Sequence, residues 1–514
     1  MRILSLSTGA FLLGSLLAPV VLAQDANQAD LRQPNAVRQT AFEYDNYLYF
    51  APDQGKAGAT DQNAPPSAAA TPAAPADAAK EEKKDEEKKD EAEAPKDEGW
   101  KLPQPCFLKE HGWAVNGWLD VGMTFNGAYP SDGYNSPVGF NDLNQQPQVN
   151  QIYLSVNKAV DTKGCGIDYG GSLDILYGSD ARFTQANGLE TPGNPTTIPA
   201  ATPATPNFAY AYSPYRFALQ QAYLDLGIDN LTIRTGHFVT NLGNETIDPR
   251  GNFFYSHSYT FLYGIPYTHT GMEFTYKFND CWTAMGGIQT GQNQFDYSPP
   301  SNLPGVNYTG AGLPGQYEHM GWLGGITYTG PCKKLSVNFQ ISISDDQVNT
   351  VGFLPAQVPS GLCDPVTQFT LIAKYNLSDK LVYTAEETYG QQTDAANGVA
   401  TWYGFNQYLQ YTINDKWSAG LRGEWFRDNN GILVSNLEQF SANTFANAGT
   451  PVSFPGDFFE ITAGLNWKPN ANLVVRPEIR YDWSDATGAA GQKPYNGGTT
   501  ADQFLFAVDA ILTF

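Results

Sequence analysis

The chain has 514 residues, of which 16% are charged and 13% aromatic, and it carries a formal net charge of −22 with an isoelectric point near 4.5. This acidity excludes nucleic acid as an expected partner, because nucleic-acid binding uses basic patches. No stretch after the N-terminus approaches the ~20 consecutive apolar residues of a membrane helix. A chain that is rich in aromatic residues, carries 50 glycines and 34 prolines and has no such helix belongs to one of two classes of protein, a large soluble β protein or a transmembrane barrel.

The N-terminus predicts a secretory signal peptide over residues 1–23. Arg2 precedes an apolar run over residues 11–21, and Val21 and Ala23 supply the small side chains that a signal peptidase reads. A membrane anchor is disfavoured because the run is short and polar sequence begins at Gln24.

Residues 24–100 differ in composition from everything that follows. Small polar residues, Ala and Pro fill positions 51–79, and KEEKKDEEKKDEAE follows at 80–93. Such a segment buries nothing, and its Glu/Lys pairs at i,i+4 contribute only roughly a few tenths of a kcal/mol each. We predict a disordered periplasmic tether over 24–100 and a β-barrel over 101–514. As an alternative role, the tether is a spacer that contacts the cell wall.

The last strand of the chain shows the pattern that defines the rest. Over residues 503–514 the apolar side chains alternate with polar ones and the chain stops at Phe514. A period of two over this length predicts a β-strand with one apolar face. A terminal aromatic residue in such a strand is typical of outer-membrane barrels, so we predict that Phe514 is the signal read by the barrel assembly machinery.

Similar alternating runs recur along the chain and give about sixteen strands of ~10–13 residues, the length that a tilted strand needs to cross a bilayer. The expected strand starts are Val115, Val149, Cys165, Arg216, Leu231, Tyr267, Cys281, Glu318, Leu335, Val366, Leu381, Trp402, Trp417, Asp457, Leu473 and Gln503. Hairpin turns such as Asp229-Asn230 and Asn279-Asp280 alternate with long joints such as 179–215 and 428–456.

We therefore predict an all-β fold, a transmembrane antiparallel up-and-down β-barrel of about 16 strands with short periplasmic turns and long external loops. A soluble sandwich does not explain the alternation in connection length. An even number of antiparallel strands places both barrel ends on the side of the short turns. The N-terminal arm is therefore expected in the periplasm, and the barrel among the lipids of the outer membrane of a Gram-negative-type envelope.

A motif over residues 236–271 points to a family. It reads GHFVTNLGNETIDPRGNFFYSHSYTFLYGIPYTHTG. This stretch resembles the OmpL-like family of β-barrel porins, in which G-x-F-x-T and G-x-E precede N-F-F-Y-S-H-S-Y and Y-G-I-P-x-T-H-T-G. The resemblance extends from about Gly117 to Phe514 and excludes the tether. It implies an outer-membrane pore and assigns neither a solute nor functional residues.

The segment 241–266 within this motif is too irregular for a strand and too aromatic for a solvated loop. In a barrel wide enough to leave a lumen, we expect it to fold inward and narrow the pore. The side chains expected to face the channel are Glu245, Asp248, Arg250, Tyr255, His257, Tyr259 and Tyr263. The alternative is a loop packed over the barrel mouth without contact to solute.

The inward faces of the last strands and the first one predict a wall of mixed charge. The side chains expected to line the pore are Arg476, Glu478, Arg480 and Asp482, together with Arg422, Glu424, Glu460, Asp509 and Asp120. Facing rows of charge set ion preference because low-dielectric walls focus their field. The alternative is that these residues only pair with one another along the wall.

Enzymatic function is disfavoured, and no cofactor or metal is expected. The five histidines form no HExxH, and there is no GxSxG. The cysteines Cys165, Cys281 and Cys332 fall at or near short turns, Cys106 precedes the barrel and Cys363 lies in a long loop. Periplasmic-side disulfides are compatible with an oxidising compartment, with one cysteine left over.

The sequence thus predicts an outer-membrane porin, a water-filled channel for passive diffusion of ions and small polar solutes. The alternative is a structural or adhesive barrel that tethers envelope layers through its N-terminal arm. Large porins often assemble as trimers, so a homotrimer is the expected assembly.

Overall fold

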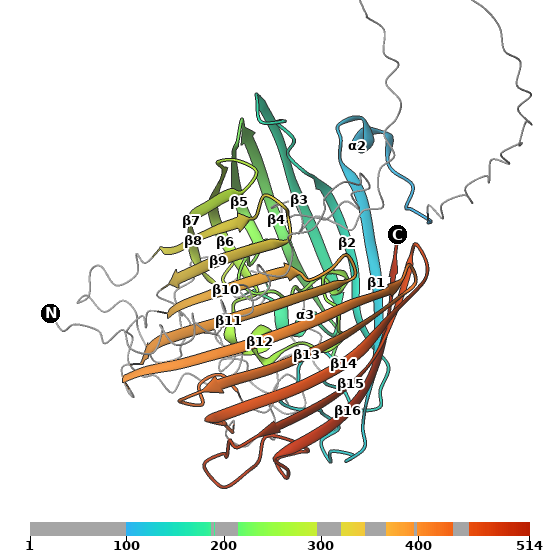
Figure 1. Ribbon diagram of the computed structural model, residues 1–514, viewed down its shortest axis with the longest axis vertical. Helices are drawn as coiled ribbons and strands as arrows, with labels where there is room; N and C mark the ends of the chain where they lie inside the picture. Colours follow the sequence, from blue (N-terminus) through green and yellow to red (C-terminus); the bar gives the residue numbers. More distant parts are fainter. Residues whose placement is uncertain are drawn as a thin grey trace, which may run out of the picture.

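Sixteen antiparallel strands form a closed barrel in the computed structural model, which describes residues 99–186, 190, 214–295, 320–344, 366–394, 398–434 and 452–514 (Figure 1). The strands are β1 Ala114–Asn126, β2 Gln148–Lys158, β3 Ile167–Gly178, β4 Arg216–Ile228, β5 Leu231–Val239, β6 Thr268–Lys277, β7 Trp282–Gln292, β8 Gly321–Thr329, β9 Leu335–Ser344, β10 Val366–Asn376, β11 Leu381–Asp394, β12 Gly398–Asn414, β13 Trp417–Asp428, β14 Gly456–Asn470, β15 Leu473–Ser484 and β16 Asp502–Thr513. Each strand pairs with its sequence neighbours, and β16 closes the barrel on β1. The predicted fold class is confirmed.

Most strands begin within one residue of the expected position, because the apolar alternation that predicts them is also what places them. The start expected at Cys165 moves to Ile167. Gly164 and Gly166 adopt positive φ angles of 76° and 99°, so the backbone is still turning there. The start expected at Glu318 moves to Gly321.

The connection between β11 and β12 differs from the predicted alternation of short turns and long loops. The start expected at Trp402 moves to Gly398, because the pairing of the two strands continues to Asp394 and Gly398. Only residues 395–397 join the strands at this end. The other expected long joints remain longer than the hairpin turns at the opposite end.

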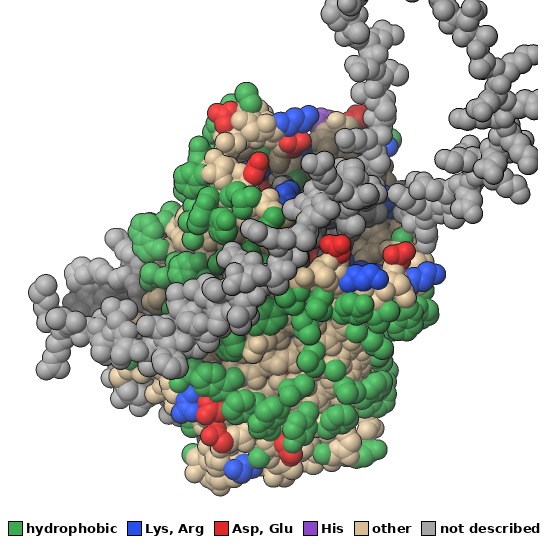
Figure 2. All heavy atoms as spheres, viewed as in Figure 1, with side chains coloured by type: hydrophobic (Ala, Val, Ile, Leu, Met, Phe, Trp, Pro, Cys, Tyr) green, Lys and Arg blue, Asp and Glu red, His purple; other side chains and the backbone are tan. Residues whose placement is uncertain are grey.

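The outer face of the barrel is apolar, as the alternation predicts. Figure 2 shows hydrophobic side chains spread over the strands, with most charged ones gathered near the ends. Aromatic pairs lie along the strand ends, such as Trp417 with Trp467 at 5.9 Å and Phe459 with Trp483 at 5.3 Å between ring centroids. The strand ends lie at the level of the two membrane–water interfaces, where amphipathic aromatic rings are favoured. Separately, none of the described helices is long and apolar enough to span a membrane.

The N-terminal arm joins the barrel at the rim where the chain ends, and α2 (Cys106–Glu110) lies at the same end (Figure 1). The backbone N–H of Trp100 donates to Oδ1 of Asn472 at 2.6 Å, and Nδ2 of Asn472 donates back to the Trp100 carbonyl at 2.7 Å. The Trp100 ring lies 6.0 Å from that of Phe514. Asn472 belongs to the short turn between β14 and β15, so the arm leaves the barrel on the side of the short turns.

The signal peptide, the tether up to residue 98 and Cys363 lie outside the described residues. The four cysteines that the structure describes carry free thiols, so no disulfide joins Cys106, Cys165, Cys281 and Cys332. The expectation of periplasmic disulfides is not met among these four.

Deleting Phe514 should leave export intact and reduce the amount of heat-modifiable, assembled barrel, because the terminal aromatic residue is expected to be read during insertion. Trp100→Ala is the matched control, since it removes the same ring contact from the other side and keeps the terminus. Electrophoresis of unheated outer-membrane fractions gives the assembled fraction. Equal assembly of the deletion variant and the wild type would contradict the role given to Phe514.

Candidate functional site

The segment between β5 and β6, here called the inward loop (residues 241–266), lies inside the barrel. Its first residues reach the opposite wall, where the Gly243 N–H donates to Thr370 Oγ1 of β10 at 3.3 Å. Near its end, the Gly264 carbonyl accepts from Trp402 Nε1 of β12 at 3.1 Å. Two short helices shape it, η3 (Pro249–Gly251) and η4 (Thr260–Gly264). The loop therefore crosses the lumen.

Glu245 anchors the first half of the loop to the wall. Its Oε1 accepts from Arg422 Nη1 at 2.8 Å and from the Tyr408 hydroxyl at 3.1 Å. Its Oε2 accepts from the Ser258 N–H and from His257 Nδ1, both at 3.0 Å. Four donors converge on this one carboxylate, which is 6% exposed.

The charge states in this anchor follow from its surroundings. Burial raises the pKa of Glu245, but the Arg422 guanidinium and the His257 hydrogen bond outweigh burial and hold that pKa at about 2. Burial lowers the pKa of His257. At neutral pH the carboxylate is therefore charged and the imidazole neutral, with its donated proton on Nδ1.

Two wall carboxylates bind the second half of the loop through its backbone. Glu478 of β15 accepts from the N–H groups of Tyr255 at 2.8 Å and Ser256 at 3.1 Å. Glu424 of β13 accepts in the same way from the next pair of amides, Tyr259 at 2.6 Å and Thr260 at 2.7 Å. Successive N–H groups that converge on one anion form a backbone nest, a strong and geometrically specific contact.

Two wall arginines bind the loop carbonyls. Arg476 Nη1 donates to the carbonyls of Pro249 and Asn252, both at 2.8 Å, and the guanidinium also pairs with Asp509. Arg480 Nη1 donates to the His257 carbonyl at 2.6 Å. The wall thus supplies anions to the loop's amides and cations to its carbonyls.

Arg480 also pairs with Asp482 on its own strand, and Asp482 accepts from the Tyr259 hydroxyl at 2.8 Å.

Of the residues expected to face the channel, those in the loop are mostly enclosed, with Tyr259 0% and His257 5% exposed. The wall residues Arg476, Glu478, Arg480 and Asp482 are likewise buried. The structure therefore places eight of the predicted site residues in the contact between the inward loop and the wall: Glu245, Tyr255, His257, Tyr259, Arg476, Glu478, Arg480 and Asp482. A role for them in permeation stays a prediction.

Inward-facing glycines make room for the loop's rings, and sequence reasoning missed them. A Cβ on Gly420 of β13 would come within 2.3 Å of the Phe253 ring. A Cβ on Gly122 of β1 would come within 2.3 Å of Tyr255. Glycine at inward positions of alternating strands was the available signal, because it marks a close approach by another group.

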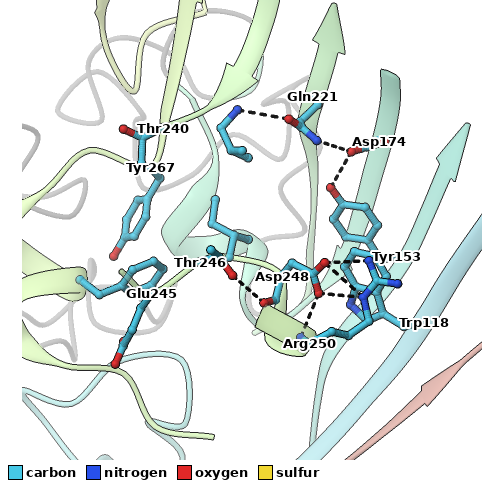
Figure 3. Close-up of a pocket in the computed structure, with 13 residues that line it drawn as sticks. Trp118, Tyr153, Asp174, Gln221, Thr240, Glu245, Thr246, Asp248, Arg250 and Tyr267 are labelled. Atoms are coloured by element: carbon cyan, nitrogen blue, oxygen red, sulfur yellow. Dashed lines mark hydrogen bonds and ion pairs between the residues drawn. The ribbon is translucent and has the colours of Figure 1, made fainter. Parts of the chain in front are cut away.

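A small pocket, here called the opening, lies between the inward loop and the wall formed by β1 to β5. It is lined by Trp118, Tyr153, Asp174, Gln221, Val239, Thr240, Glu245, Thr246, Ile247, Asp248, Arg250, Phe261 and Tyr267 (Figure 3). Asp248 and Arg250 keep partial exposure here, with side chains 30% and 12% exposed, and form an ion pair at 2.7 Å. These two predicted site residues therefore border the opening.

The wall side of this opening is aromatic and polar. The rings of Trp118 and Tyr153 stack at 3.8 Å between centroids, and the Arg250 guanidinium lies 3.9 Å from the Trp118 ring. The Tyr153 hydroxyl and Gln221 Nε2 both donate to Asp174, as Figure 3 shows. Sequence reasoning missed Trp118, Tyr153, Asp174 and Gln221, because it sought the lining among the densest charges and not on the wall opposite them.

A closed sixteen-stranded barrel crossed by an inward loop has the architecture of an outer-membrane porin. The chain belongs to the family described as "Putative beta-barrel porin-2, OmpL-like", whose sequence profile matches residues 112–514. The resemblance inferred from residues 236–271 is confirmed. Among curated proteins, no relative matches the chain.

Solved structures with a similar fold include several outer-membrane channels. Pseudomonas putida OprB has a TM-score of 0.46 at 14% identity, covering 79% of this chain and 96% of its own. The outer membrane channel DcaP of Acinetobacter baumannii has a TM-score of 0.43 at 11% identity, covering 78% and 97%. Salmonella typhi OmpF has a TM-score of 0.44 at 11% identity, covering 79% and 99%.

Replacing Arg422 by Gln should lower the free energy of unfolding by about 3–5 kcal/mol, because it leaves buried carboxylates without their cation. Arg422 is 0% exposed and pairs with both Glu245 and Glu460. The control is Arg427→Gln, which breaks a partly exposed pair with Asp457 and should cost under about 1 kcal/mol. Urea titration of the refolded barrel measures both. Equal losses in the two variants would contradict the anchoring role of Arg422.

Proposed function

We propose that this porin forms a water-filled channel for passive diffusion of ions and small polar solutes, narrowed by the inward loop. The observation that carries the proposal is the attachment of the loop across the lumen to β10–β15, with a pocket between the loop and β1–β5. A loop held by buried charges is a fixed constriction and not a mobile flap. The pore is therefore expected to conduct without a gating step.

The lining of the opening supports polar solutes as the permeant class. Carboxylate, amide and hydroxyl groups from Asp174, Gln221, Thr240 and Asp248 border it, beside the rings of Tyr153 and others. Such groups replace part of a solute's hydration shell, whereas an apolar solute gains little from them.

Reconstitution into a planar bilayer tests the proposal directly. The mature protein should give stepwise insertions with ohmic conductance that does not depend on the sign of the voltage. A barrel that inserts without conductance would contradict the channel and favour the structural or adhesive alternative. Heat-modifiability of the reconstituted sample controls for correct folding.

Ion preference is expected to respond to the charges that border the opening. Arg250→Gln should shift the reversal potential in a salt gradient toward stronger cation preference, because it leaves the partly exposed Asp248 without its counter-charge. Arg427→Gln, at the end of β13, is the matched control and should leave the reversal potential unchanged. An equal shift in both variants, or none in either, would place Arg250 off the permeation path.

The wall arginines are proposed to act on permeation as well. Replacing Arg476 and Arg480 together by Gln is expected to increase cation preference, since both cations contact the loop that narrows the pore.

The N-terminal arm is proposed to extend into the periplasm and to contact the cell wall through residues 24–100. This is supported by the docking of Trp100 on the rim of the short turns, next to Phe514. In this arrangement, the assembly machinery that reads Phe514 acts on the same side of the membrane as the N-terminal arm.

A further inference from the structure

The charged side chains that line the opening are mostly acidic. They are Asp174, Glu245, Asp248 and Arg250. Glu245 forms a salt bridge with Arg422, and Asp248 forms one with Arg250. The donors to Asp174 are neutral hydroxyl and amide groups, which belong to Tyr153, Ser155, Ser172 and Gln221. Among the described residues no cation pairs with Asp174, so the opening favours a cationic ligand over an anionic one.

Aromatic rings line the opening together with these carboxylates. Trp118, Tyr153, Phe261 and Tyr267 all contribute to its wall. Aromatic rings attract organic cations such as guanidinium and substituted ammonium groups. A metal ion instead needs several oxygen, nitrogen or sulfur ligands, and the described residues contain no group of three acidic, histidine or cysteine side chains that could hold one. The lining therefore indicates an organic cation.

The inward loop already places one such cation on these rings. The Arg250 guanidinium lies 3.9 Å from the centre of the Trp118 ring. It also donates to both oxygens of Asp248, from Nε at 2.9 Å and from Nη2 at 2.7 Å, as Figure 3 shows. The ring and the carboxylate thus form a site in which a planar cation is bound.

A second group of the same kind lies on the neighbouring wall and differs in its exposure. Arg234 of β5 lies 3.8 Å from the Tyr223 ring and donates twice to Asp225 of β4, each time at 2.9 Å. Asp225 and Arg234 face each other across paired strands, and the Asp225 side chain is only 6% exposed. Asp248 and Arg250 instead belong to a loop, and 30% of the Asp248 side chain is exposed. Only the group on the loop is therefore accessible to a solute.

The size of the opening limits the ligand to a small head group. Its volume is about 40 Å³. This is room for about three water molecules at roughly 10–15 Å³ each. A guanidinium or a small ammonium group is of this size, whereas a whole sugar ring is not.

We propose that the opening is a weak binding site for the guanidinium or alkylammonium head group of an organic solute, and that Arg250 occupies the same ring when no solute is bound. The inference rests on the proposed channel function and names a class of solute for it. An entering head group competes with Arg250 for the Trp118 ring and the Asp248 carboxylate, and the charge of Asp174 favours its entry. The competition keeps binding weak, which a channel requires because the solute has to leave again.

Block of the single-channel current in a planar bilayer tests the site. The probes are butylguanidinium and butylurea, which have nearly the same shape and differ in charge. Butylguanidinium should block the wild-type current reversibly, and butylurea at the same concentration should not. Arg250→Gln should lower the half-blocking concentration of butylguanidinium about tenfold, because the competing cation is removed from the ring.

Two tryptophan variants test the ring itself. Trp118→Leu should raise the half-blocking concentration about tenfold, because the cation–π contact is lost. Trp322→Leu is the matched control and should leave the block unchanged, since Trp322 lies on the outer face of β8 and is 59% exposed. Heat-modifiability shows whether each barrel has folded. If Trp118→Leu does not fold, the result for Arg250→Gln decides, because misfolding does not tighten binding.

The outcomes separate this inference from the channel function on which it rests. A folded wild-type barrel without conductance, before any probe is added, would contradict the channel and the binding site together. A conducting channel that butylguanidinium does not block, or that butylurea blocks equally, would overturn the binding site alone. Unchanged or weaker block in Arg250→Gln would overturn it as well, as would equal effects of Trp118→Leu and Trp322→Leu.

Discussion

The lumen of this barrel is organised by one constraint, the need of the inward loop to satisfy its backbone away from a sheet. Loop amides pair with Glu424 and Glu478, and loop carbonyls pair with Arg476 and Arg480. Hydrogen bonds to charged groups contribute about 1.5–3 kcal/mol each, and an unmatched buried charge costs more than that. The charges on the wall and the course of the loop therefore depend on each other.

This dependence divides the inner wall by function. The charged strands β13 to β15 hold the loop, and the glycines among them admit its aromatic rings. The wall from β1 to β5 carries fewer charges and borders the opening, where Asp248 and Arg250 retain exposure. The dense charge of one side thus supports the loop, and the proposed function places the solute mainly against the other side.

The barrel was predictable from the sequence because side-chain alternation is a local signal. Within each strand, the alternation of apolar and polar side chains shows which face contacts lipid, as it does over residues 504–514. The inward course of residues 241–266 was also accessible, from aromatic residues in an irregular segment. The partners of Glu245 or Arg476 were not, since they lie 177 and 227 positions away along the chain. A period of two shows which face of the sheet a residue occupies, but it does not show which loop residue contacts that side chain inside the lumen. For the same reason the stacked pair of Trp118 and Tyr153 was missed.

Amide hydrogen exchange of the inward loop tests the central claim most directly. If wall carboxylates bind the backbone of the loop, the N–H groups of Tyr255, Ser256, Tyr259 and Thr260 exchange as slowly as those of the strands, although none belongs to a sheet. Exchange as fast as in the hairpin turn at Asn279 would contradict a loop fixed by buried charges.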